Sequence, residues 1–333
     1  MTNPFVFIVG CPRSGTTLLL RMVDAHPQIA IIPEIGWIPR RYENREGLTP
    51  EGLVTPAFIQ DLLEKGGLGR YTRLPMSRQE LEGLLASGRP LSYARLITLL
   101  FDRYGEARGK TLVGNKTVEY VLSIPTLHSL WPHAKFVHLI RDGRDVCLSA
   151  INWRKAGKLA SRFATWSEDP VSAAALWWEW QVRLGREAGR SLGDDLYYEM
   201  RYEALVAHPM EECAALCAFL GVPYDGAMLR FHEGRMRMDL DLDAKHAWLP
   251  PTPGLRDWRL QMLPEDLERF EAAAGDLLVE LGYPRGADHL RARSLEHAAG
   301  IRRAFEGRPL PERWPIHALS NFKLQTSNYK SPE

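Results

Sequence analysis

A glycine-rich loop near the N-terminus constrains this chain more than any other feature. It reads Gly10-Cys11-Pro12-Arg13-Ser14-Gly15-Thr16-Thr17 and fits the phosphate-binding pattern G-x-x-x-x-G-K-[ST] at every position except the lysine. Residues 5–9 read as a buried strand and residues 16–25 as a helix with apolar residues at helical spacing, so the loop lies at a strand-to-helix junction. The alternative, a tight turn in which Gly15 only supplies unusual dihedrals, does not explain that context.

The missing lysine narrows the class of ligand. In nucleoside triphosphatases this lysine reaches the β- and γ-phosphates, and the hydroxyl beside it holds Mg²⁺. Here Thr16 takes its place and Arg13 stands three residues earlier, so the loop is poorly suited to a γ-phosphate. Backbone N–H groups and the helix N-terminus still form an anion site, to which Arg13, Thr16 and Thr17 add donors. The loop therefore predicts a nucleotide with a shorter anionic chain, bound without a metal.

Composition and charge exclude several function classes. The chain has 333 residues, 45% of them hydrophobic, and a net charge of +1 with acids and bases interspersed. This balance indicates a globular protein without the field that would attract nucleic acid or a membrane surface. Neither end resembles a targeting signal, and the early apolar run is too short to span a membrane, so we expect a cytoplasmic protein. Buried thiols, not zinc ligands or disulfides, are expected at Cys11, Cys147, Cys213 and Cys217.

Strand and helix patterns alternate along the chain. Buried strands are expected at residues 5–9, 29–32, 112–115, 135–140 and 196–202, and the main helices at 16–25, 123–131, 146–153, 170–190, 203–220 and 264–281. This alternation predicts an α/β, P-loop-like, three-layer fold with a mostly parallel central sheet and helices on both faces. A helical insertion is expected over residues 37–110, with helices near 56–64, 77–86 and 92–104. We expect one domain over residues 1–290 and a C-terminal extension over 291–333 whose tail past about residue 308 is loosely ordered.

Polar residues follow three of the expected strands. In open α/β sheets the ligand lies beyond the carboxyl ends of the strands, so these positions are candidate site residues. They are the loop 10–17, the segment Asn115-Lys116-Thr117, and Arg141 with Ser149 eight residues later. A helix that begins near Asp142 would place Ser149 about two turns in, where it shares an anion with Arg141 only if the intervening chain folds suitably.

These motifs resemble those of sulfotransferases that use 3′-phosphoadenosine 5′-phosphosulfate (PAPS), closest in pattern to the bacterial and tyrosylprotein types. Residues 11–17 look like the family's 5′-phosphosulfate loop, and Arg141-Asp142-Gly143-Arg144-Asp145-Val146-Cys147-Leu148-Ser149 looks like its 3′-phosphate motif. A third, less specific segment is similar to Tyr202-Glu203-Ala204-Leu205-Val206 followed by Pro209 and Phe219-Leu220-Gly221. The resemblance spans roughly residues 4–285.

The resemblance implies PAPS as the sulfuryl donor, its desulfated form (PAP) as the product, and no required metal. It assigns the donor to Arg13, Ser14, Gly15, Thr16 and Thr17 at one end and to Arg141, Ser149 and Tyr202 at the other. It also accounts for the missing lysine, because PAPS has no γ-phosphate, and Arg141 can hold a 3′-phosphate through a planar fork of donors. The acids Asp142 and Asp145 are instead expected to be solvated charges at a helix start.

Catalytic roles follow by analogy with phosphoryl transfer. An in-line attack needs positive groups near the leaving oxygen, and Arg13 and Lys116 are the candidates, although Lys116 also fits an ordinary surface lysine. The acceptor hydroxyl needs a base. In the tyrosylprotein type this base is a glutamate in a segment similar to residues 33–40, which implies Glu34 here, with Glu119 in reserve and an ordinary surface carboxylate as the alternative.

Several assignments stay open at the level of the sequence. The acceptor is a small-molecule, glycan or peptide hydroxyl, with no feature that chooses among them. Arg256 and Arg259 either close over the phosphates or pair with local acids. A non-catalytic PAPS- or PAP-binding module and, less favoured, an atypical P-loop kinase remain alternatives to a sulfotransferase. Five tryptophans gather after the 3′-phosphate motif, and the three-residue spacing of Trp177 and Trp180 favours a place in the core for those two over a ligand platform.

Overall fold

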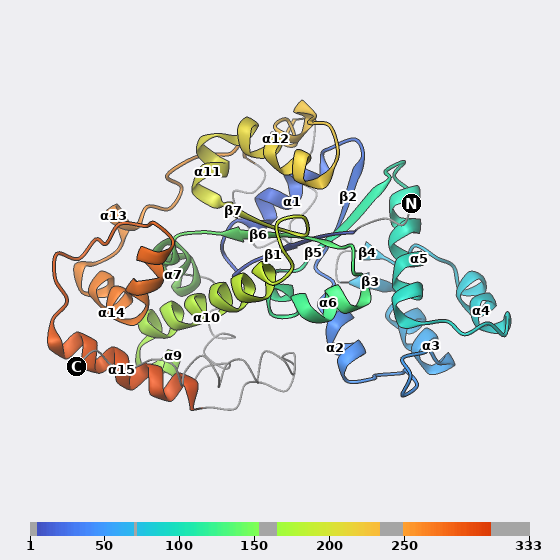
Figure 1. Ribbon diagram of the computed structural model, residues 1–333, viewed down its shortest axis with the longest axis horizontal. Helices are drawn as coiled ribbons and strands as arrows, with labels where there is room; N and C mark the ends of the chain where they lie inside the picture. The colour runs from blue at the N-terminus through green and yellow to red at the C-terminus, as the bar shows by residue number, and fades with distance from the viewer. Residues whose placement is uncertain (1–4, 70–71, 153–164, 234–248, 308–333) are drawn as a thin grey trace.

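A five-stranded parallel sheet forms the centre of the protein. The computed structural model describes residues 5–69, 72–152, 165–233 and 249–307 (Figure 1). The sheet has the strand order β2-β5-β1-β6-β7. Its strands are β1 (Val6–Val9), β2 (Ile29–Pro33), β5 (Leu112–Lys116), β6 (Lys135–Ile140) and β7 (Tyr197–Arg201). All four pairings are parallel, so the carboxyl ends of the strands meet at one edge.

Helices cover both faces of this sheet. Alternate residues of β1 separate the faces: Val6 and Ile8 join one core cluster, whereas Phe7 and Val9 join the other. The first cluster lies under α1 (Thr16–Asp24) and α12 (Pro209–Leu220), and the second under α6 (Ile124–Leu130) and α10 (Pro170–Arg190), as Figure 1 shows. This arrangement confirms the predicted three-layer α/β fold with a parallel sheet.

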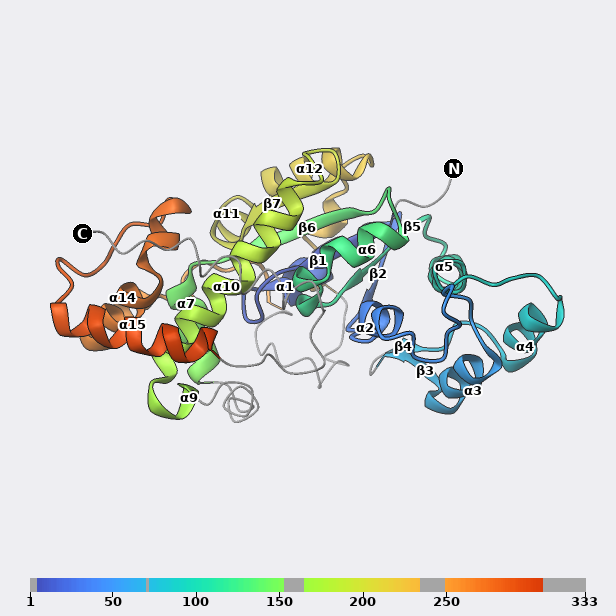
Figure 2. The same cartoon turned by 60° about the horizontal axis from the view of Figure 1, so that its bottom comes forward.

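The segment between β2 and β5 is mainly helical. It contains α2 (Ile38–Glu43), α3 (Pro56–Lys65), α4 (Arg78–Ala86) and α5 (Tyr93–Glu106). Serine and threonine hydroxyls cap three of these helices, and at α4 the Ser77 and Glu80 side chains form a reciprocal capping box. A short hairpin of β3 (Gly67–Gly69) and β4 (Thr72–Arg73) is added, which the sequence pattern did not predict. Figure 2 shows the hairpin beside α2.

The chain after β7 differs from prediction at one point. The single helix expected over residues 203–220 is two helices, α11 (Tyr202–Ala207) and α12. His208 between them has φ −132° and ψ 58°, and Pro209 is the first residue of α12. Proline has no N–H to continue the hydrogen bonding of α11 but suits the first turn of a new helix, so Pro209 explains the break.

Several short helical elements lie between the larger ones. They are the 3₁₀ turns η1 (Val118–Leu122) and η2 (Gly226–Met228), and the helices α7 (Gly143–Ile151), α9 (Thr165–Glu168) and α13 (Trp258–Gln261). The helix expected over residues 146–153 begins earlier, at Gly143, because Asp142 accepts a hydrogen bond from the Arg144 N–H and caps it.

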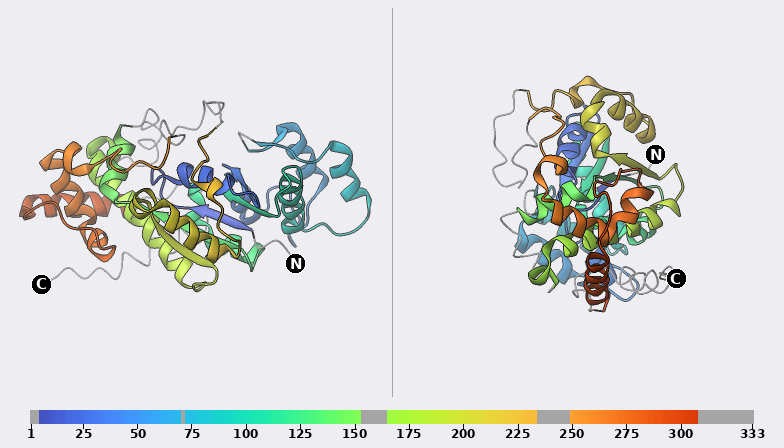
Figure 3. Two further views of the ribbon diagram at one scale, coloured as in Figure 1. Left: turned by 90° about the horizontal axis from the view of Figure 1, so that it is seen from above. Right: turned by 90° about the vertical axis from the view of Figure 1, so that its left-hand side faces the viewer.

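Two longer helices follow near the C-terminus, α14 (Pro264–Glu280) and α15 (Ala292–Glu306). Residues Ala298, Ile301 and Phe305 of α15 are buried in the same core cluster as α10, although no helix was expected there. The insertion and these C-terminal helices lie at opposite ends of the long axis of the molecule (Figure 3). The predicted loose tail past residue 308 lies outside the described residues.

Candidate active site

The loop after β1 has a backbone that requires its glycines. Gly10 has φ 155°, Arg13 has φ 77° and Gly15, the N-cap residue of α1, has φ 93°. A Cβ atom on Gly10 would lie 2.6 Å from the Leu139 carbonyl oxygen of β6, and one on Gly15 would overlap the ring of Tyr202. The loop is therefore packed tightly between the ends of β6 and β7, with left-handed residues that turn it into α1.

A direct hydrogen bond joins this loop to α7. Nε of Arg13 donates to Oγ of Ser149, 3.0 Å away, and Ser149 is buried. Because β1 and β6 are neighbours in the parallel sheet, the chain leaves both strands at the same edge, and there Arg13 of the loop reaches Ser149 of α7. The structure thus brings together a residue of each predicted phosphate motif.

Arg141, at the end of β6, lies over the ring of Tyr202. Its guanidinium carbon is 4.2 Å from the ring centroid, its Nη2 is 3.1 Å from a carboxylate oxygen of Asp145, and Trp178 Nε1 donates to its backbone carbonyl. The Tyr202 ring touches Gly15 on the loop, so it lies between the two motifs. The cation–π contact with Tyr202 and the buried ion pair with Asp145 fix the guanidinium at the carboxyl edge of the sheet.

Two polar atoms at this place lack a partner within the described part of the chain. They are Oγ of Ser14 and Nε of Arg141, each buried on a residue that is less than a tenth exposed. A buried donor without an acceptor costs free energy, so such atoms favour a ligand that accepts hydrogen bonds. An anion held between the loop and Arg141 fits both.

Lys116 and Glu34 form an ion pair at the ends of β5 and β2. The Lys116 side chain is 2% exposed, whereas that of Glu34 is 35% exposed. The pair therefore places a buried ammonium beneath a carboxylate that still reaches solvent. Glu34 has φ 47°, one of four non-glycine residues with positive φ in the described chain.

The remaining predicted residues lie in α1, in η1 and around the start of α13. Thr16 is buried and Thr17 half-buried in the first turn of α1. Glu119, the reserve base, is exposed on η1. Arg259 pairs with Asp257 at 3.7 Å and lies over the ring of Trp258. Of the two roles left open for Arg259, the structure therefore shows pairing with a local acid. Arg256 is half-buried.

The acids of the 3′-phosphate motif are not the solvated charges that the sequence predicted. Asp142 and Asp145 are both buried. Asp142 pairs at 2.7 Å with Arg144. Arg144 is fully buried, pairs also with Glu271 at 2.8 Å, and stacks on the ring of Trp258. The prediction was wrong because α13 and α14 cover this turn.

Asp145 is a further residue of the site that the sequence reasoning missed. One of its carboxylate oxygens accepts from the Arg141 guanidinium and the other from the Trp258 N–H at 3.0 Å. Burial raises the pKa of Asp145, against the opposing effect of the nearby Arg141 charge. Trp258 lies 113 residues further along the chain, so no local pattern could reveal this link.

The other sequence expectations concern the core. Trp177 and Trp180 are buried, as predicted, and so are Trp166 and Trp178, while Trp153 lies outside the described residues. All four cysteines are free and buried, as expected. Burial raises the pKa of Cys213 to about 12 and that of Cys217 to about 11, so neither thiol ionises readily.

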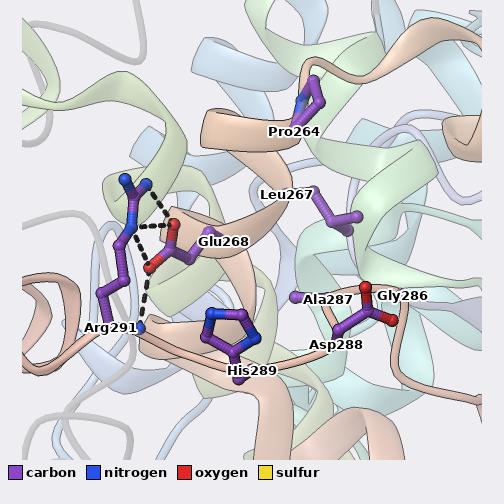
Figure 4. A pocket seen from close by; sticks show the side chains of 8 residues that line it. All are labelled: Pro264, Leu267, Glu268, Gly286, Ala287, Asp288, His289 and Arg291. Atoms are coloured by element: carbon purple, nitrogen blue, oxygen red, sulfur yellow. Dashed lines mark hydrogen bonds and ion pairs between the residues drawn. The ribbon is translucent and has the colours of Figure 1, made fainter.

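A separate cavity of about 330 Å³ lies at the start of α14 (Figure 4). Its lining includes Glu268 and Arg291, which face each other and form an ion pair. It contains none of the predicted site residues. Among the described residues we find no group of acids, histidines and cysteines placed to hold a metal. None of the described helices has the length and apolarity to span a membrane.

Comparison with known proteins gives one consistent result. A family model described as the sulfotransferase family matches residues 4–226. Protein-tyrosine sulfotransferase A of Caenorhabditis elegans is 26% identical over 293 residues, covering 86% of this chain and 69% of that protein. Nodulation protein NoeE of Sinorhizobium fredii is 27% identical over 300 residues, covering 86% of this chain and 67% of that protein.

Solved structures share the fold. The sulfotransferase domain from the curacin biosynthetic pathway superposes with a TM-score of 0.56 at 21% identity, covering 84% of this chain and 98% of that domain. Some relatives are considerably longer, since the chain spans 52% of the Drosophila melanogaster protein-tyrosine sulfotransferase.

Proposed function

Because this chain belongs to the sulfotransferase family, we propose that it transfers the sulfuryl group of PAPS to a hydroxyl acceptor and releases PAP. The loop 10–17 binds the 5′-phosphosulfate, and Arg141 with Ser149 binds the 3′-phosphate. The observation that carries this proposal is the hydrogen bond between Arg13 and Ser149, since one nucleotide can reach two anion sites only when they adjoin. The buried Ser14 hydroxyl and Arg141 Nε supply the unused donors for its oxygens.

The charges at the site suit in-line transfer. Arg13 and Lys116 stabilise the negative charge that develops on the 5′-phosphate oxygen as its bond to sulfur breaks. Glu34 takes the proton from the acceptor hydroxyl as that oxygen forms its bond to sulfur. The Glu34–Lys116 ion pair supports this assignment, because it holds the base beside a group that neutralises the leaving oxygen. No metal is needed for this arrangement of charges.

The acceptor is proposed only by class. It is a hydroxyl of a small molecule, a glycan or a peptide, and the names of several relatives favour the tyrosine of a protein. The half-exposed Trp37 and the turn around Gly36 follow Glu34 closely in the chain, and we propose that they border the acceptor. A cytoplasmic location stays a prediction.

Two alternatives compete with this proposal. A non-catalytic PAPS- or PAP-binding module would need both phosphate motifs but no base, and the Glu34–Lys116 pair disfavours it. An atypical P-loop kinase would need a group for the γ-phosphate, and Thr16 disfavours it because it replaces the lysine.

Ligand binding separates the nucleotide classes. We expect PAP to raise the thermal unfolding temperature and ATP with Mg²⁺ to leave it unchanged. The opposite pattern would reject both the sulfotransferase and the PAPS- or PAP-binding module, and would favour the kinase. Mass spectrometry of a metabolite and peptide mixture incubated with PAPS then identifies the acceptor by the added sulfuryl mass.

A second experiment tests the base. Glu34→Gln is expected to bind PAP as tightly as the parent protein but to lose about 10²- to 10⁴-fold in transfer rate, the usual contribution of general base catalysis. Glu119→Gln, an exposed carboxylate on the neighbouring η1 turn, is the matched control and should keep its rate. Unchanged turnover in Glu34→Gln would eliminate Glu34 as the base.

A further inference from the structure

The backbone of Glu34 is held in an unfavourable conformation. With φ 47° it is left-handed, a region that glycine, asparagine and aspartate enter readily and glutamate seldom does. The residue before it, Pro33, still pairs with Lys116 in the β2–β5 ladder, so the change of conformation occurs within one residue. Such a conformation persists only when the surrounding structure determines it.

Two buried hydroxyl groups bind both polar backbone groups of the next residue, Ile35. Oγ1 of Thr117 accepts a hydrogen bond from the Ile35 N–H at 2.9 Å, and the Tyr120 hydroxyl donates to the Ile35 carbonyl. The Tyr120 oxygen also accepts from the Ile38 N–H at 3.3 Å. Thr117 and Tyr120 are 3% and 2% exposed, so water does not compete for these bonds. The peptide groups on both sides of Ile35 are therefore fixed by side chains from another segment of the chain.

The Glu34 backbone is confined from two more directions. Its N–H donates to the Lys116 carbonyl at 2.8 Å, which extends the strand pairing by one bond. On the opposite side Gly69 of β3 approaches so closely that a Cβ atom there would lie 2.5 Å from the Glu34 carbonyl oxygen. The hairpin is in turn attached through Leu68, whose carbonyl accepts from the Trp37 indole at 2.6 Å. The Glu34 backbone thus lies between η1 and the hairpin.

We propose that Thr117 and Tyr120 are positioning residues, which hold Glu34 in the left-handed conformation that directs its carboxylate onto Lys116. This inference rests on the proposed role of Glu34 as the base. In the described structure neither hydroxyl forms a hydrogen bond with the side chain of Glu34 or Lys116; both act through the backbone of Ile35. Without them the backbone relaxes toward the extended region and turns the carboxylate away from Lys116.

The test uses Thr117→Val, which keeps the shape of threonine but removes the acceptor, and Thr117→Ser, which restores it. We expect Thr117→Val to lower the rate at which PAP is formed from PAPS by about 10- to 100-fold, because a small misplacement of a catalytic group has an effect of this size. The rate is measured with water as acceptor and with a tyrosine-containing peptide. Thr117→Ser should recover most of it, and both variants should bind PAP as the parent protein does. Equal rates for Thr117→Val and Thr117→Ser would overturn the inference.

A double variant distinguishes this inference from the proposed function. If Thr117 acts through Glu34, adding Thr117→Val to Glu34→Gln costs no further rate, whereas additive losses contradict the inference. A crystal structure of Thr117→Val gives a reading that is independent of activity: Glu34 should leave the left-handed region. If Glu34 stays in the left-handed region in this structure, the inference is overturned, even when Glu34→Gln is inactive. If Glu34→Gln keeps its activity, Glu34 is rejected as the general base, and the crystal structure alone decides whether Thr117 holds its backbone.

Tyr120→Phe supplies a second route in case Thr117→Val does not fold. It removes the hydroxyl that donates to the Ile35 carbonyl and keeps the ring, which packs against Phe7. The same loss of rate with unchanged PAP affinity is expected. A Tyr120→Phe protein with the parent rate would count against the inference.

Discussion

At the scale of single residues, the site depends on one ring. Tyr202 lies with Gly15 against its edge and the Arg141 guanidinium over its face. The resemblance placed Tyr202 among the nucleotide contacts, but the sequence did not indicate that it touches both motifs. Its position means that the conformation of the loop and that of the arginine are not independent.

Gly15→Ala tests this coupling. A methyl group there overlaps the Tyr202 ring, and an alanine with φ 93° is strained as well. We expect Tyr202 and Arg141 to shift and PAP to bind at least about tenfold more weakly, a loss of about 1.4 kcal/mol, measured by titration calorimetry.

Gly193→Ala is the control for the strain alone. Gly193 has φ 81°, and a Cβ atom on it meets nothing within 4 Å. It precedes β7, whereas the site lies after the strands. PAP affinity should be unchanged there, and a Gly15→Ala protein that matches this control would disprove the coupling through Tyr202.

At the scale of elements, the first turn of α7 joins the sheet to the C-terminal helices. Arg144 in that turn is fully buried and pairs with Asp142 and with Glu271 of α14. Glu271 also accepts hydrogen bonds from the N–H groups of Gly286 and Ala287. A single buried cluster of charges therefore ties α7, α14 and the chain after α14.

Glu271→Gln is expected to destabilise the protein strongly. It leaves the buried Arg144 charge with one carboxylate in place of two, and removal of one partner of a buried ion pair typically costs about 3–5 kcal/mol. We expect about 3 kcal/mol in the free energy of unfolding by urea, because Asp142 remains.

The matched control lies on the same helix. Glu280→Gln removes an exposed partner of Arg183 and should cost less than about 1 kcal/mol. Equal losses for the two variants would show that burial of the Arg144 pair does not decide its contribution.

The sequence predicted the sheet well because β1, β2 and β6 are short, nearly continuous apolar runs, of which residues 135–140 are an example. It failed where partners are remote or patterns short. The hairpin strands have only three and two residues, and Glu271 is 127 residues from Arg144. The resemblance supplied Glu34 as a candidate and the polar end of an expected strand supplied Lys116, but their contact depends on the β2–β5 pairing, which no local pattern contains.

At the scale of the whole molecule, one core cluster runs from end to end. It includes Phe58 of the insertion, Phe7 and Phe136 of the sheet, and Phe270 and Phe305 of the C-terminal helices. The family model ends at residue 226, yet α14 and α15 complete the same core. The shared core predicts that the described residues unfold as one cooperative unit.

This unit should lose stability in mild acid because of His138. This residue is fully buried in β6, with Nδ1 2.6 Å from the Tyr197 hydroxyl, and burial lowers its pKa to about 4. The unfolded value is about 6.5, so the unfolded chain binds the proton first. The stability from neutral His138 is complete above about pH 6.5 and is lost as the pH falls toward 4.

The expected loss from this group is about 2 kcal/mol between about pH 7 and pH 5, measured by urea unfolding. In His138→Leu that part of the pH dependence should vanish, although the variant also loses the bond to Tyr197. His133→Gln, at an exposed position, should keep the full dependence. An unchanged slope in His138→Leu would contradict the assignment.

The strand order also governs when the molecule can assemble during synthesis. β1 is translated before both of its neighbours, β5 and β6, which leave the ribosome more than a hundred residues later. Until then the nascent apolar run of β1 has no native partner and is a natural target for chaperones. The glycine loop packs against Leu139 of β6, so it reaches its working shape only after the chain has emerged beyond Ile140.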